Sequence, residues 1–298
     1  MRREELALYG SIAFVIVFWG LAFTAIKVAL EHMSWVTLTL LRFATAAVPF
    51  AVYLAWVRPK PPIARKDLPM VSLLGFLGFT GYHLFLNLGE TDPRTTAGTS
   101  ALVIASAPAF IAILAVALLK EKVTPLRASG IGLAFAGLAV MLLLAAPESE
   151  FRVSLTVGAA LVLPAAVFAA FYAILGKPYL KKYRPFQLVA YAVFFGLLFT
   201  LPIAAWDATQ TARDVAALTF PAYLPVLLLA LFPTFIAYGL YFRVLQRIEA
   251  SAVGAYIYLS TLVAVLGGIY FLGEPLTLPA VLGGVMVIGG VYLAQRRG

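Results

Sequence analysis

The stretch LKEKVTPLRASGIGLAFAG at residues 119–137 is matched 153 residues later by LGEPLTLPAVLGGVMVIGG at residues 272–290. Each stretch ends an apolar segment at a Glu, places a Thr three residues further on, and continues into a Gly-rich apolar run. The corresponding pairs are Glu121 and Glu274, Thr124 and Thr277, Gly130 and Gly283, and Gly137 and Gly290. Because this offset is about half of the 298-residue chain, the pattern indicates a duplicated unit.

The composition is typical of a protein whose surface faces lipid. Hydrophobic residues make up 63% of the chain, charged residues only 12%, and the mean hydropathy is +0.97. Since soluble domains carry about 25% charged residues, most of this surface must lie in a bilayer. The chain has no cysteine, which excludes disulfides, thiolate metal sites and a cysteine nucleophile.

The apolar segments are long enough to cross a membrane. Spanning roughly 30 Å of hydrocarbon takes about 20 helical residues. We expect ten transmembrane helices, at residues 7–30, 34–57, 68–90, 96–118, 125–146, 153–176, 186–206, 220–242, 250–272 and 276–294. The first is too long for the apolar core of a signal peptide, so we expect it to be retained.

The positive charges fall on one side of such an arrangement. If the N-terminus is cytoplasmic, the cytoplasmic segments hold 17 of the 22 Lys and Arg residues, the outer loops hold three, and two lie within spans. Basic residues concentrate on the cytoplasmic side of membranes, so both termini are expected in the cytoplasm. The net charge of +9 then faces anionic lipid headgroups, and no nucleic-acid partner is predicted.

The loop charges also indicate that the two units insert with opposite orientations. Each unit has five expected helices, an odd number, so the second unit enters the membrane from the other side. The loop after the second helix has four basic residues, whereas its counterpart after the seventh has Asp207, Arg213 and Asp214. We therefore expect an all-α membrane protein built from two inverted five-helix repeats, residues 1–147 and 148–298, that together form one transport unit.

Several segments resemble the drug/metabolite transporter superfamily, in its EamA-type branch. They are Trp19-Gly20 and residues 27–30, Leu41-Arg42-Phe43, residues 105–108, and the two repeated stretches. The resemblance covers nearly the whole chain and implies ten helices around a central cavity. It also implies a bacterial exporter of metabolites such as amino acids, the YddG-type exporters of aromatic amino acids being one example. The first repeated stretch departs from the family in having Lys120 where the second has Gly273, which affects the local turn.

Two positive charges lie inside the expected spans, where a charge is usually functional. Lys27, near the outer end of the first helix, either reaches the headgroups beside Glu31 or contacts an anionic substrate group. Arg42 lies eight residues into the second helix, where reaching the headgroups is harder. It either pairs with carbonyls or an acidic loop residue, or lies on the transport path. Its counterpart in the second unit is Phe195, so the two units are functionally unequal.

Polar and aromatic residues in the spans are candidates for a substrate site. His83 and Asn87 lie four residues apart and share a helix face; His83 either gates transport by titrating or holds helices together. Rings and hydroxyls would suit an apolar or aromatic amino acid, although single rings also serve as core or interfacial residues. The candidate substrate-binding residues are Trp19, Tyr82, His83, Asn87, Phe171, Tyr172, Tyr238, Tyr256 and Ser260.

Two prolines and two glutamates have structural alternatives. Pro108 and Pro164 break helical hydrogen bonds at mid-depth and act either as hinges or as fixed kinks. Glu121 and Glu274 lie at helix junctions, where we expect capping or loop pairing.

The sequence also predicts how transport is driven. The absence of a P-loop motif excludes ATP as the energy source, and no cofactor or metal is predicted. All 13 acidic residues are expected outside the spans or at their edges, which favours a facilitator or exchanger over an ion-coupled pump. We predict a multi-pass exporter of aromatic and other apolar amino acids in the bacterial inner membrane, working by alternating access; its oligomeric state is open.

Three alternatives remain at this point. The same fold can carry phosphorylated or nucleotide sugars, which need several bases in the cavity, or cationic drugs. An intramembrane enzyme needs a cluster of histidines or acids, whereas His32 and His83 lie 51 residues apart. A passive channel is also compatible with the sequence.

Overall fold

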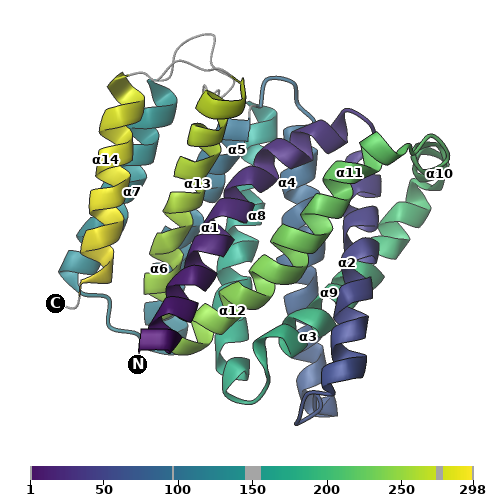
Figure 1. Cartoon of the computed structure of the whole chain (residues 1–298), viewed down its shortest axis with the longest axis horizontal. Coiled ribbons are helices and arrows are strands. Elements are labelled where there is room, and N and C mark those ends of the chain that lie inside the picture. The colour runs from purple at the N-terminus through teal and green to yellow at the C-terminus, as the bar shows by residue number, and fades with distance from the viewer. Residues whose placement is uncertain (1, 96, 145–155, 273–277, 297–298) are drawn as a thin grey trace.

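The computed structural model describes residues 2–95, 97–144, 156–272 and 278–296 (Figure 1). Within these ranges the chain forms helices and turns, with no strand. The α-helices are α1 (Arg2–Leu30), α2 (Trp35–Val57), α3 (Leu68–Gly75), α4 (Tyr82–Glu90), α5 (Ala97–Ile104), α6 (Ala107–Leu119), α7 (Pro125–Leu143), α8 (Val157–Gly176), α9 (Pro185–Trp206), α10 (Ala208–Ala216), α11 (Phe220–Leu229), α12 (Tyr238–Arg247), α13 (Ala250–Leu272) and α14 (Leu278–Gln295). Short 3₁₀ segments are η1 (Arg65–Asp67) and η3 (Lys177–Lys181), and π-helical segments are η2 (Phe76–Gly81) and η4 (Ala230–Ala237).

The helices confirm a multi-pass membrane protein. Seven described stretches are long and apolar enough to cross a bilayer: Glu4–Leu30, Trp35–Val57, Arg65–Glu90, Ser100–Leu119, Val157–Lys181, Pro185–Trp206 and Phe220–Arg247. Three shorter apolar stretches, Pro125–Val140, Ala250–Ala264 and Val281–Gln295, fall where the fifth, ninth and tenth spans are expected. The total of ten spans stays a prediction. Both termini lie at the same end of the bundle (Figure 1).

The fourth expected span and the loop after the seventh differ in detail from the prediction. The fourth is two helices, because the chain breaks at Ala105 and Ser106 and Pro108 lies in the first turn of α6. The break therefore precedes the proline, which fits the first turn of a helix because it needs no N–H donor there. Pro164, by contrast, lies within the continuous helix α8. The short helix α10 follows α9 and was not predicted.

The third and eighth spans each contain a π-helical segment in the middle. Segment η2 joins α3 to α4, and η4 joins α11 to α12. The two segments begin 154 residues apart, close to the 153-residue offset of the repeated stretches. In η4 the Thr234 hydroxyl donates to the Leu229 carbonyl five residues back (2.8 Å). Such segments are rare and often lie at functional sites.

The glycines of the repeated stretches lie where helices α7 and α14 pack together at one edge of the bundle (Figure 1). A Cβ atom added to Gly130 would lie 2.6 Å from the Gly290 carbonyl oxygen, and one added to Gly137 would lie 2.7 Å from the Gly283 oxygen. Each glycine thus faces the counterpart of the other glycine, as in a self-complementary interface. Small residues let two backbones approach this closely in a membrane.

The first repeated stretch also caps a neighbouring helix. The carboxylate of Glu121 accepts hydrogen bonds from the backbone N–H groups of Ala250 (2.8 Å) and Ser251 (3.2 Å), at the start of α13. It also pairs with the Lys177 ammonium at 3.1 Å. Burial by itself raises the pKa of Glu121, but these donors outweigh it and hold the pKa below its ordinary value. Capping by Glu121 is confirmed; Glu274 lies outside the described residues.

Candidate functional site

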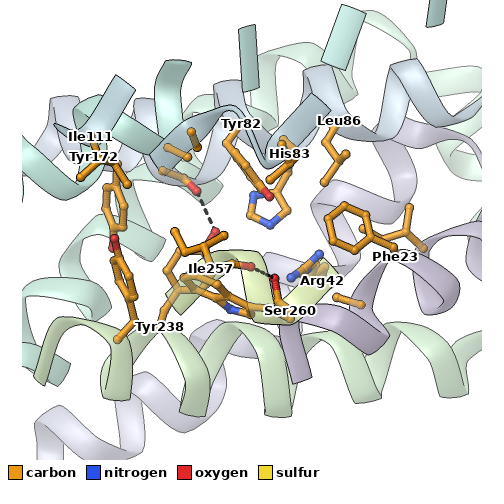
Figure 2. Close-up of a pocket in the computed structure, with 18 residues that line it drawn as sticks. Phe23, Arg42, Tyr82, His83, Leu86, Ile111, Tyr172, Tyr238, Ile257 and Ser260 are labelled. Atoms are coloured by element: carbon orange, nitrogen blue, oxygen red, sulfur yellow. Dashed lines mark hydrogen bonds between the residues drawn. The ribbon is translucent and has the colours of Figure 1, made fainter. Parts of the chain in front are cut away.

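A cavity lies in the middle of the bundle, between helices of both predicted units (Figure 2). Its volume is about 70 Å³. A cavity of this size holds a few water molecules. It is lined by Trp19, Ala22, Phe23, Ile26, Arg42, Gly78, Tyr82, His83, Leu86, Ile104, Ala107, Ile111, Ala169, Tyr172, Tyr238, Tyr241, Ile257 and Ser260. Most of this lining is apolar or aromatic, as in small-molecule sites generally.

The structure brings most of the predicted site residues together. Trp19, Tyr82, His83, Tyr172, Tyr238 and Ser260 line the cavity, as does Arg42. Asn87, Phe171 and Tyr256 do not, and neither do Lys27, Pro108 and Pro164. The apolar lining residues, such as Ile26 and Leu86, were not predicted, because one apolar residue among many in a span carries no distinguishing signal.

Asn87 lies on the same helix as His83 but holds two helices together. Its side-chain amide donates to the Thr39 hydroxyl of α2 (2.9 Å), and its carbonyl oxygen is buried without a hydrogen-bond partner. Phe171 packs against the apolar core beside the cavity. The four-residue spacing of His83 and Asn87 therefore does not put both side chains into the cavity.

Arg42 is a buried cation whose guanidinium group faces the cavity. The residue is 2% exposed, and its Nε donates to the Thr234 hydroxyl (2.8 Å), which in turn donates to the Leu229 carbonyl. Its two terminal nitrogens have no hydrogen-bond partner among the described residues, and Figure 2 shows the guanidinium directed into the cavity. Among the described residues, no acid lines the cavity. A buried charge without a counter-charge is costly, so an anionic group is the ligand that this arrangement favours.

His83 faces the cavity with a defined tautomer. Its Nδ1 lies 3.0 Å from the Phe79 carbonyl oxygen, and because a carbonyl only accepts, Nδ1 carries the hydrogen. The ring packs edge-on against Phe43 and Tyr82, with centroids 5.0 and 4.7 Å away. A neutral His83 therefore has Nε2 left as its hydrogen-bond acceptor.

Further aromatic rings line the cavity beside His83, and the Tyr238 ring lies 6.3 Å from the His83 ring. The Trp19 ring lies 5.1 Å from the ring of Tyr238 and 5.0 Å from that of Tyr241. The Tyr172 ring lies 5.9 Å from that of Tyr238, and its hydroxyl is buried without a hydrogen-bond partner. Gly78 makes room for Tyr172, since a Cβ there would lie 2.6 Å from a ring carbon.

Two further hollows continue from the cavity toward the end that holds both termini. The second, of about 20 Å³, shares Trp19, Tyr241, Ile257 and Ser260 with the cavity. The third, of about 840 Å³, shares Ile12 and Tyr256 with the second. Its lining includes Lys122, Arg127, Lys177 and Arg247, so we call this end of the molecule the basic end. Tyr256 therefore lies between the open third hollow and the inner two.

In the described part of the chain, apolar side chains close the opposite end of the cavity. Phe23 and Ile26 of α1 pack with Leu86 of α4 and Ile104 of α5 in one buried apolar cluster. Beyond this cluster the Lys27 ammonium donates to the carbonyl oxygens of Glu90 (2.7 Å) and Thr95 (2.5 Å). Lys27 thus joins α1 to the end of α4 and does not line the cavity.

Glu90 is a polar residue that the sequence did not single out. It is the last residue of α4, and the prediction placed it at the edge of a span. In the structure it is 2% exposed, and both carboxyl oxygens are buried without a hydrogen-bond partner. A carboxyl group at the edge of a span is therefore buried here and not exposed to water. The position of the acidic residues at span edges consequently gives less support to a facilitator over an ion-coupled pump.

Comparison with known proteins gives the family. The profile of the EamA-like transporter family matches residues 8–143 and again residues 156–295. An uncharacterised transporter of Archaeoglobus fulgidus is 35% identical over 96% of this chain and 98% of its own length. A probable terminal-alkyne amino-acid exporter of Streptantibioticus cattleyicolor is 33% identical over 96% of this chain and 93% of its own length.

Two more distant comparisons agree with this result. A probable amino-acid metabolite efflux pump of Salmonella typhimurium is 28% identical over 94% of this chain and 91% of its own length. A crystal structure of a protein only 17% identical superposes with a TM-score of 0.70 over 98% of this chain and 96% of that chain, which shows a shared fold. With a helical membrane bundle, a central cavity and a family profile that matches nearly the whole sequence, the chain belongs to the EamA-like transporter family.

Proposed function

We propose that this protein exports amino acids, aromatic and other apolar ones included, through the central cavity by alternating access. The chemistry of the cavity supports this cargo: a single cation binds the carboxylate, and a largely apolar, aromatic lining receives the side chain. Aromatic faces also attract an ammonium group, so a zwitterion finds partners for both of its charges. Relatives named as amino-acid exporters support the same substrate class.

The observation that carries the proposal is the orientation of Arg42. A guanidinium binds a carboxylate through paired N–H groups, and the terminal nitrogens of Arg42 face the cavity without protein partners among the described residues. Cationic drugs fit poorly, because the described lining of the cavity contains no acid. Phosphorylated and nucleotide sugars carry two or more negative charges, for which the lining offers one arginine.

The fold supports a carrier made of two inverted units, residues 1–147 and 148–298. The family profile matches once within each unit, and a π-helical segment lies at corresponding places in both. The reciprocal glycine contacts between α7 and α14 also support two related units, because equivalent residues of the two units meet. Inverted repeats that rock around a central site produce alternating access. The distribution of basic residues supports an orientation with both termini in the cytoplasm, and we propose a bacterial inner membrane as the location.

The state seen here is then the one closed to the outside. The three hollows lead from the cavity to the basic end, while the apolar cluster and Lys27 close the other end. Substrate would enter past Tyr256 from the cytoplasm.

Competition for uptake in liposomes tests the role of Arg42. Wild-type protein should take up labelled L-phenylalanine, and unlabelled L-leucine should compete, whereas L-phenylalaninamide should not, because it lacks the carboxylate. Loss of a hydrogen-bonded charge contact costs about 1.5–3 kcal/mol, so Arg42→Gln should lower uptake at sub-saturating substrate roughly 10- to 100-fold. Arg42→Lys should retain part of the activity.

Arg213→Gln is the matched control, because Arg213 is exposed on α10 and its loss changes the net charge equally. It should leave uptake within about twofold, as surface changes generally do. Equal competition by the amide and the amino acid, or full activity of Arg42→Gln in folded protein, would contradict the proposal.

A further inference from the structure

Glu90 lies where a negative charge has little support. It ends α4 and is almost completely buried, and neither carboxyl oxygen has a hydrogen-bond partner. The Lys27 ammonium is nearby, but it donates to the backbone oxygens of Glu90 and Thr95, not to the Glu90 carboxylate. A carboxylate here would be a buried charge without donors, whereas a protonated carboxyl group is neutral and costs far less to bury.

The described neighbours of Glu90 offer little other charge. Helices α8 and α5 have no charged residue, α2 has only Arg42, and α1 contributes Lys27 at this end of the molecule. In the loop after α4, Asp92 pairs with Arg94 and accepts from the Gly158 N–H. The Ser100 hydroxyl is buried next to the Glu90 carboxyl group, but neither group has a hydrogen bond of normal geometry. Glu31 and His32 are exposed in the turn after α1.

The position of Glu90 links its charge to opening. Leu86, four residues earlier on α4, belongs to the apolar cluster that closes the cavity, and one helical turn of about 5.4 Å separates it from Glu90. The Lys27 contacts tie α1 to the Glu90 backbone in the same closed arrangement. Separating α1 from α4 would expose the Glu90 carboxyl to water and release Lys27 to pair with it.

We infer that Glu90 is a proton-binding site, and that the end of the molecule around Lys27 closes only when Glu90 carries a proton. Opening hydrates the carboxyl group, which then loses its proton to the outside and is stabilised by Lys27. Acidic medium on that side favours the closed, inward-facing state, and alkaline medium favours opening. The inference rests on the proposed alternating access and orientation, but not on the identity of the cargo.

A single cysteine measures opening directly, because the chain has none of its own. Ala107→Cys places a thiol at a buried position that belongs to the closed cluster and also lines the cavity. A membrane-impermeant maleimide is added to the outside of cells with a permeabilised outer membrane, between about pH 5 and pH 8. Rates are normalised to Ala212→Cys on the exposed face of α10, since the thiolate fraction itself rises with pH.

In the Ala107→Cys protein that keeps Glu90, the normalised labelling rate should rise about threefold or more from acidic to alkaline medium. Glu90→Gln, a neutral mimic of the protonated acid, should label at the low acidic rate at every pH, while Glu90→Asp should keep a pH response. Glu31→Gln removes an exposed carboxylate at the same end and should behave like wild type. Two results would overturn the inference. One is a normalised labelling rate that does not change with pH in the protein that keeps Glu90. The other is a pH response in Glu90→Gln as large as in that protein.

Two further measurements separate this outcome from failure of the proposed function. Ala252→Cys lines the third hollow at the basic end and should not label from outside; labelling there would show that the proposed orientation is wrong. Infrared spectroscopy of purified protein near neutral pH should show a protonated carboxyl band that Glu90→Gln lacks. Absence of that band in wild type would overturn the proton site, whatever the protein transports.

Discussion

Gly78 shows how one residue shapes the cavity. A Cβ at this position would lie 2.6 and 2.7 Å from two ring carbons of Tyr172, which itself lines the cavity. These distances are too short for a real contact, so any side chain at position 78 must displace the ring or the helix. The absence of a side chain here is therefore a condition for the observed position of Tyr172.

Gly78→Ala should consequently impair both stability and transport. Overpacking a filled site typically costs about 1–3 kcal/mol, which we expect as a lower melting temperature in detergent and reduced L-phenylalanine uptake. Gly132→Ala in α7 is the control, because a Cβ there meets nothing within 4 Å. An unchanged melting temperature in Gly78→Ala would show that the Tyr172 ring moves freely and does not limit the cavity.

At the residue scale, the sequence predicted which polar residues lie near the cavity better than it predicted their hydrogen-bond partners. Tyr82, His83 and Tyr238 reach the cavity as expected, because polar residues at helical spacing indicate an inner face. Asn87 and Lys27 do not line the described cavity, because hydrogen bonding to α2 and to the end of α4 directs them elsewhere. Burial of Glu90 depends on how α1, α4 and α5 meet, which spacing along one helix does not reveal.

At the scale of helices, α7 and α14 form a close contact between the two predicted units. Gly130 and Gly290 face each other, and a Cβ on Gly290 would meet the Gly130 carbonyl oxygen at 2.6 Å. The neighbouring Gly289 has nothing within 4 Å of an added Cβ. Two adjacent glycines in one helix thus have opposite environments. Comparing substitutions at the two positions therefore separates the effect of packing on stability from the effect of backbone freedom.

Gly290→Ala should lower stability by about 1–3 kcal/mol, because two backbones must separate. Gly289→Ala should be neutral or stabilising by up to about 1 kcal/mol, since alanine favours the helix. Denaturation in detergent, followed by circular dichroism, measures both. Equal effects of the two substitutions would contradict close packing of α7 against α14.

The elements were predicted unevenly, for identifiable reasons. Long apolar stretches such as α1 and α9 follow directly from hydropathy. The π-helical segments η2 and η4 do not, because a shift in hydrogen bonding at Gly78 or Thr234 depends on contacts with other helices. The break before Pro108 and the short helix α10 also depend on local turns that composition does not specify.

For the molecule as a whole, the repeated stretch determines more than the position of a loop. Its first copy supplies Glu121, which caps α13, and glycines of both copies join α7 to α14. The sequence predicted a helical membrane protein of this family from composition and motifs. It did not predict which end is closed, because closure depends on the distant residues of the apolar cluster and on Lys27.

Exchange across liposome membranes tests most directly the claim that this molecule is an alternating-access carrier of amino acids. Vesicles containing the purified protein are loaded with unlabelled L-phenylalanine, and the uptake of labelled L-phenylalanine is followed. The account predicts uptake that saturates with concentration and is faster into loaded than into empty vesicles. Uptake that rises linearly and ignores the internal amino acid would indicate a channel, and absence of uptake would exclude this cargo.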